Sequence, residues 1–147
     1  MEIRKIIFLI ILGYAVWMDL RTKELSGTFL LGAACVGAVV LAVWGPAGEN
    51  WQETIFACGI GGILLFISRL IGGGIGEGDG WFFIVTGLFL DVSVNLILFL
   101  TGLGLCFVVS LPLAVKSTIT RRKTALPFIP FLVPAGMWIA VLAVGYF

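Results

Sequence analysis

Two aspartates are the residues of this 147-residue chain best placed to do chemistry. Asp19 follows the apolar run Ile3–Met18, and Asp79 precedes the apolar run Trp81–Leu90. The chain contains no histidine, which excludes serine–histidine and cysteine–histidine catalysis and histidine-bound zinc. Hydrolysis would therefore depend on carboxylates, or on a serine or threonine with a lysine. We expect no metal and no cofactor.

Two carboxylates brought together near a membrane would share a proton, because like charges a few ångströms apart cannot both ionise easily. The ionised member can then act as general base on water, while the protonated member polarises the scissile carbonyl. Ser117 beside Lys116 is the other candidate pair. Adjacent residues on a helix point in different directions, so this pairing is less favoured.

A glycine-rich stretch leads into the second aspartate: Gly72–Gly80 has six glycines in nine residues. Its bare backbone can lie close to another extended chain, as a protease needs. A phosphate cradle is the competing interpretation, but no Lys-Ser or Lys-Thr follows and the acidic Glu77 and Asp79 would repel phosphate. Glu77 could attract a basic substrate, or it could be an ordinary solvated loop residue.

Composition predicts an all-α, polytopic membrane protein. Of the residues, 61% are hydrophobic and only 12% charged, against about 25% charged in soluble domains. With so little polar surface the chain needs the lipid bilayer as its solvent, and nothing suggests nucleic acid. We expect a single domain, residues 1–147, with about six transmembrane helices. The six apolar runs are Ile3–Met18, Thr28–Trp44, Thr54–Ile71, Trp81–Leu90, Val94–Val115 and Pro127–Phe147.

The fourth run is too short to span a bilayer alone. Ten residues of helix extend about 15 Å, whereas the hydrocarbon core is about 30 Å thick. The helix is therefore predicted to recruit Gly80 and Asp79, which would place Asp79 below the headgroups, where an ionisable residue is a functional candidate. The alternatives are that the bilayer thins locally or the segment is re-entrant, and that Asp79 is an interfacial cap at the helix N-terminus.

Lysine and arginine are unevenly distributed between the two sets of connections. Such residues favour the cytoplasmic side, which predicts extracytoplasmic N- and C-termini in the plasma membrane and both aspartates on the cytoplasmic side. Seven basic residues lie on the aspartates' side, against Arg4 and Lys5 on the other: Arg21, Lys23, Arg69, Lys116, Arg121, Arg122 and Lys123.

Three segments together resemble the type IV prepilin peptidases. Trp17–Leu25 is similar to the first aspartate motif of that family, and Gly76-Glu77-Gly78-Asp79 to its Gly-x-Gly-Asp motif. Leu126–Leu132 is similar to the Pro-Phe-containing start of the family's last helix. Trp81 and Leu25-Ser26 depart from the pattern, because many members have a lysine and an Ile-Pro there.

The resemblance implies an aspartyl endopeptidase that removes the basic leader from prepilin-like precursors, cutting after the leader's final glycine on the cytoplasmic side. Asp19 and Asp79 would be catalytic, and Gly76 and Gly78 would be the motif glycines. The chain lacks the extra segment with Cys-x-x-Cys pairs that larger members use for methylation, so peptidase activity alone is expected.

Two other classes of function remain open from the residues. A small transporter or channel subunit would use the aspartates to bind cations or protons, but it would need polar groups at several depths. A catalytically silent membrane scaffold of pilus or secretion machinery would keep the fold without needing either aspartate.

Overall fold

The computed structural model describes residues 2–22, 25–71, 77–120 and 128–144. These residues form α-helices and one short 3-10 helix, with no strand among them. The predicted all-α architecture is therefore confirmed. The elements are α1 (Glu2–Thr22), α2 (Gly27–Trp44), α3 (Trp51–Leu70), α4 (Glu77–Thr86), α5 (Val92–Thr120), η1 (Ile129–Leu132) and α6 (Val133–Val144).

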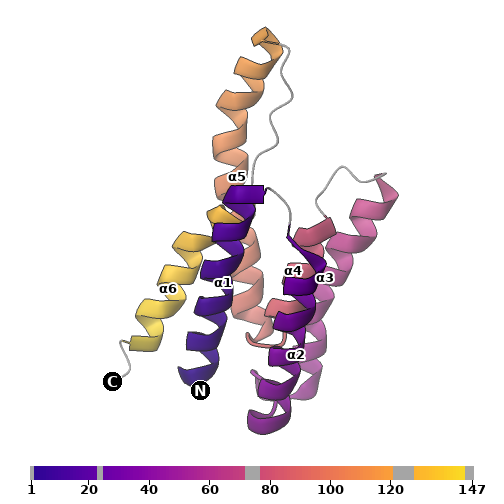
Figure 1. The fold of residues 1–147 in the computed structure, drawn as a ribbon, viewed down its shortest axis with the longest axis vertical. Helices are drawn as coiled ribbons and strands as arrows, with labels where there is room; N and C mark the ends of the chain where they lie inside the picture. The colour runs from indigo at the N-terminus through magenta and orange to yellow at the C-terminus, as the bar shows by residue number, and fades with distance from the viewer. Residues whose placement is uncertain (1, 23–24, 72–76, 121–127, 145–147) are drawn as a thin grey trace.

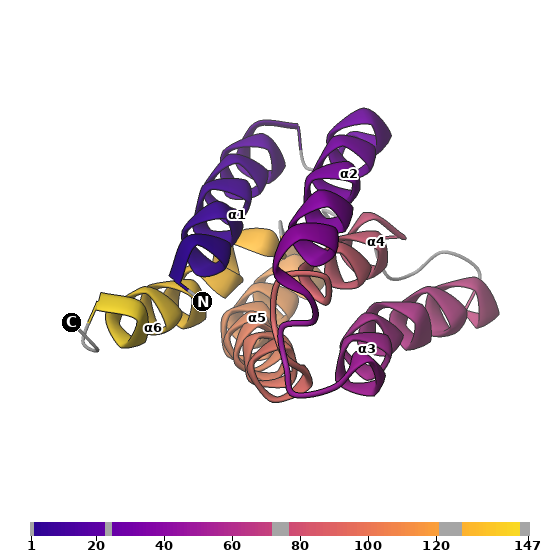
Figure 2. The same ribbon diagram turned by 90° about the horizontal axis from the view of Figure 1, so that it is seen from below.

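The helices form one bundle in which α5 lies between two groups (Figures 1 and 2). On one side α1 packs against α6 and η1, and on the other α4 packs against α3 and α2. Helix α5 contacts α3, α4, η1 and α6, and it extends beyond the others at the upper end of Figure 1. The first aspartate therefore belongs to one group of helices and the second to the other.

The outer surface of the bundle is apolar, as expected of a membrane protein. Large side chains such as Ile10, Leu31, Ile55 and Phe66 are more than half exposed. Among the residues that the structure describes, three helices are long and apolar enough to cross a bilayer: Gly27–Trp44, Trp51–Leu70 and Val92–Pro112. The interior is also apolar, with Phe8, Phe82, Phe83 and Leu98 fully buried.

Helix α4 lies against α3 with almost no side chain between the two backbones. A Cβ added to Gly61 of α3 would overlap the amide nitrogen of Ile84, and one added to Gly87 would lie 2.5 Å from the amide nitrogen of Cys58. Such small residues allow membrane helices to approach closely. This contact fixes α4, and with it Asp79, to the longer helix α3.

A buried amide holds the other end of α4. Asn95 of α5 is fully buried, and its Nδ2 donates to the carbonyl oxygen of Ala57 at 2.9 Å. The Thr86 hydroxyl donates to Asn95 Oδ1 at 2.7 Å. Helices α3, α4 and α5 are thus joined by satisfied polar groups at the end of α4 remote from Asp79.

The close α3–α4 contact predicts a difference between two neighbouring glycines. Gly61→Ala should lower the free energy of unfolding by about 1–3 kcal/mol, because the added methyl group meets backbone that cannot move aside. Gly62 has no neighbouring atom within 4 Å of an added Cβ, so Gly62→Ala should be neutral or slightly stabilising. Unfolding of both variants in the same detergent checks this, and equal stabilities would contradict the packing described here.

Candidate active site

Asp19 lies in the last turn of α1 and is almost completely buried. Its Oδ2 accepts a hydrogen bond from the backbone N–H of Ile129 at 2.9 Å. Ile129 is the first residue of η1 and is itself fully buried. A backbone segment far away in the sequence therefore fixes the orientation of the first carboxylate.

Asp79 lies in the first turn of α4, half-buried. The helix begins at Glu77, so it includes Gly80 and Asp79 as predicted, but it ends at Thr86 and is still only ten residues long. The negative charge of Asp19 acts directly on the Asp79 carboxyl, so α1 and α4 bring the two groups near each other. Among the described residues, none donates a side-chain or backbone hydrogen bond to Asp79.

A third helix also reaches the site. Cys106 of α5 lies near enough to Asp79 to feel its charge. Sequence reasoning did not place this cysteine beside an aspartate. It also missed the Ile129 amide, for which the only signal was the proline-containing segment at the start of the last helix.

The motif around Asp79 packs against the connection between α1 and α2. A Cβ added to Gly78 would lie 3.4 Å from the Cβ of Leu25, at ordinary van der Waals contact, so Gly78 lies beside this connection without being required there for space. Glu77 is exposed and available to a solvated ligand. Gly76 lies outside the described residues.

Two further predicted features can be placed. Trp81, which stands where many prepilin peptidases have lysine, is 48% exposed and points away from the core. Arg21 lies over the ring of Trp17 at 5.3 Å from its centroid, on the same turn of α1 as Asp19. The side chains of Lys116, Ser117 and Arg121–Lys123 lie outside the described part of the chain.

In the described part of the chain, the side chains near the aspartates do not form a cluster that could bind a metal ion. No group of three or more histidine, cysteine, aspartate or glutamate side chains comes together there. The described residues offer two carboxyl groups, one of which accepts a hydrogen bond from a backbone donor, while the other has no such donor among them. That asymmetry suits a pair whose members carry different charges.

Comparison with known proteins identifies the family. A model of the type IV leader peptidase family matches residues 6–113, a range that includes both Asp19 and Asp79. No protein in a curated set and no solved structure is significantly similar to the chain. The family match covers most of the chain and agrees with the resemblance seen in its motifs, so this membrane protein belongs to the type IV leader peptidase family.

Proposed function

We propose that the chain is a membrane aspartyl endopeptidase that removes the basic leader from type IV prepilin-like precursors. The observation that carries the proposal is that α1 and α4 bring Asp19 and Asp79 near enough for the charge of one carboxyl group to affect the other. Membership of the leader peptidase family supports the class of substrate. No cofactor is required by this chemistry.

In the proposed mechanism, Asp19 is the general base. The Ile129 N–H donates to its Oδ2, and such a donor stabilises a carboxylate. Asp79 carries the shared proton and donates it as a hydrogen bond to the scissile carbonyl oxygen. Asp19 takes a proton from a water molecule as the water oxygen attacks the carbonyl carbon. The resulting tetrahedral intermediate collapses when Asp19 passes the proton that it took from water to the leaving nitrogen, and the C–N bond breaks as the carbonyl of the new carboxyl group forms.

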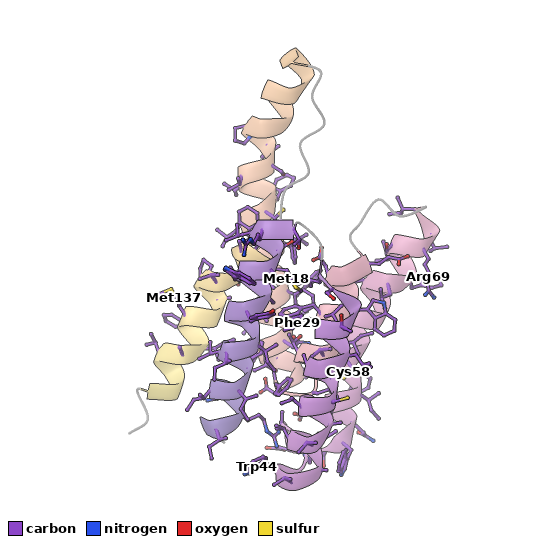
Figure 3. The ribbon with its side chains drawn as sticks, in the orientation of Figure 1. Met18, Phe29, Trp44, Cys58, Arg69 and Met137 are labelled. Carbon is purple, nitrogen blue, oxygen red and sulfur yellow. The ribbon has the colours of Figure 1, made fainter. Side chains whose placement is uncertain are left out.

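We also propose that this chemistry takes place at the cytoplasmic face, with both termini extracytoplasmic. Arg21 and Arg69 end helices α1 and α3 on the same side of the bundle as Asp19. Met18, which precedes Asp19, and Arg69 lie at about the same height in Figure 3, well above Trp44 at the lower end. The positive-inside rule supports a cytoplasmic position for the upper end.

The exposed carboxylate of Glu77 fits a substrate with a basic leader. It lies two residues before Asp79, where opposite charge would raise the local concentration of a cationic peptide. The cut would follow the final glycine of the leader. No methyl transfer is part of the proposal.

The shared proton predicts a bell-shaped dependence of kcat/KM on pH. Activity requires one carboxyl ionised and the other protonated, so the rate should fall toward low pH, where both are protonated, and toward high pH, where both ionise. Cleavage of a prepilin-like precursor by the purified protein in lipid vesicles checks this. Glu49 is exposed and lies outside the site, so the Glu49→Gln variant should keep the fall in kcat/KM on both sides of the optimum. A profile that falls on only one side would contradict the shared proton.

A further inference from the structure

The start of α1 carries a buried cation at the end of the bundle remote from the aspartates. Arg4 is only 7% exposed, although arginine is almost never buried without partners. Its Nη2 donates to the carbonyl oxygen of Gly45 at 2.7 Å, and it forms no ion pair with any residue that the structure describes. Since the guanidinium has five N–H donors, one carbonyl leaves most of its bonding capacity for something else.

Arg4 faces a cavity that contains charges of both signs. The cavity has a volume of about 130 Å³ and is lined by Arg4, Lys5 and Asp91, with apolar side chains completing its wall. Asp91 caps α5 by accepting the Val94 N–H on Oδ1 at 2.9 Å. One carboxylate oxygen of Asp91 is thus committed to the helix, while its charge remains available to the cavity.

The charged cavity adjoins an apolar groove between α5 and α6. Val94 and Ile139 line both spaces. The groove has a volume of about 220 Å³, and its lining includes Ile97 and Trp138, which are 57% and 64% exposed. It therefore opens onto the apolar outer surface of the bundle, where hydrocarbon chains of the membrane lie.

We propose that the cavity and groove together bind one glycerophospholipid with a zwitterionic amine headgroup. The phosphate lies at Arg4 and Lys5, the primary ammonium at Asp91, and an acyl chain follows the groove between α5 and α6. Arginine binds phosphate through paired N–H donors. A headgroup with only negative charge would be repelled by Asp91, and a water-soluble phosphate compound would leave the adjoining apolar groove unfilled.

The site is separate from the aspartates. Arg4 and Asp19 lie on one helix, about 22 Å apart at a rise of 1.5 Å per residue, so the lipid site occupies the opposite face of the membrane. The inference therefore goes beyond the proposed peptidase function, and its failure would leave that function untouched.

Native mass spectrometry of the delipidated protein tests the proposal. Titration with phosphatidylethanolamine, phosphatidylcholine and phosphatidylglycerol of equal chain length gives the affinity for the first bound lipid. We expect phosphatidylethanolamine to bind most tightly, because phosphatidylcholine has no N–H to donate to Asp91 and phosphatidylglycerol has no cation. Equal affinities for the three lipids, or tighter binding of phosphatidylglycerol, would overturn the proposal.

Three variants test separately the parts of the site that would bind the phosphate, the ammonium group and the acyl chain. Arg4→Gln, which keeps an N–H donor for Gly45, should weaken phosphatidylethanolamine binding about tenfold or more. Asp91→Asn, which keeps the cap on Val94, should abolish the preference over phosphatidylglycerol. Thr101→Phe should weaken binding of all three lipids by filling the groove.

Matched changes elsewhere serve as controls. Arg69→Gln removes a cation at the other end of the bundle, and Ile63→Phe adds an aromatic ring on the exposed surface of α3; both should bind lipid as the wild type does. If Arg4→Gln does not fold, the other two variants decide the question. If the folded Asp91→Asn and Thr101→Phe variants bound the three lipids with wild-type affinity, the proposal of a lipid site here would be wrong.

Discussion

Replacing either Asp19 or Asp79 with asparagine is expected to lower kcat/KM for leader removal by about a hundredfold to ten-thousandfold, the contribution typical of general acid–base catalysis. Asparagine has nearly the same size and shape as aspartate, but it can neither accept the proton of water nor donate a carboxyl proton. Asp19→Asn keeps an acceptor for the Ile129 amide, so the fold near η1 should persist. Cleavage of a prepilin-like precursor in vesicles gives the rates.

Two controls separate lost chemistry from lost structure. Glu49→Gln removes an exposed carboxylate from the connection between α2 and α3 and should cleave at the wild-type rate. The helical circular dichroism and thermal unfolding of both aspartate variants should match those of the wild type. Normal activity in either aspartate variant would rule out the proposed pair of carboxyl groups.

The second large effect on kcat is expected when the backbone N–H of Ile129 in η1 is removed. Substituting Ile129 with its α-hydroxy acid analogue turns the amide N–H into an ester oxygen and leaves the side chain unchanged. Asp19 Oδ2 then loses the donor that lies at 2.9 Å. Hydrogen bonds to charged groups are worth about 1.5–3 kcal/mol, so kcat should fall by roughly tenfold to a hundredfold, with little change in KM.

The position of the ester provides the control. An α-hydroxy acid at Val141 removes a backbone donor from α6, on the exposed surface and away from both aspartates. That protein should retain near wild-type kcat. If the two esters lowered kcat equally, or if the Ile129 ester left kcat unchanged, the amide would have no role in positioning Asp19.

The helices were predictable because their signal is contained in runs of apolar residues. All six predicted segments correspond to helices, and the shortness of the run Trp81–Leu90 correctly predicted that α4 begins before Trp81 and includes Asp79. The run continues past the end of α4 at Thr86, which hydropathy could not show. Gly87, the residue after the end of α4, lies so close to the backbone of Cys58 that an added Cβ would overlap it, and hydropathy gives no sign of such a contact between distant segments.

The two aspartates were predictable from residue type and motif, but their surroundings were not. The donor to Asp19 is a backbone amide, and every residue except proline has one, so side-chain types give no signal. Arg4 was predicted only as a charge at the outer end of the first helix. Its burial depends on the carbonyl of Gly45, which a left-handed backbone with φ of 76° presents to it.

The most direct test of the catalytic pair is a mass-spectrometric map of the products formed from one prepilin-like precursor. The precursor is incubated separately with the wild type and with a folded protein carrying both Asp19→Asn and Asp79→Asn. We expect a single cut after the final glycine of the leader with the wild type, and an intact precursor with the double variant. An intact precursor with the folded wild type, or the same cut with the double variant, would contradict it.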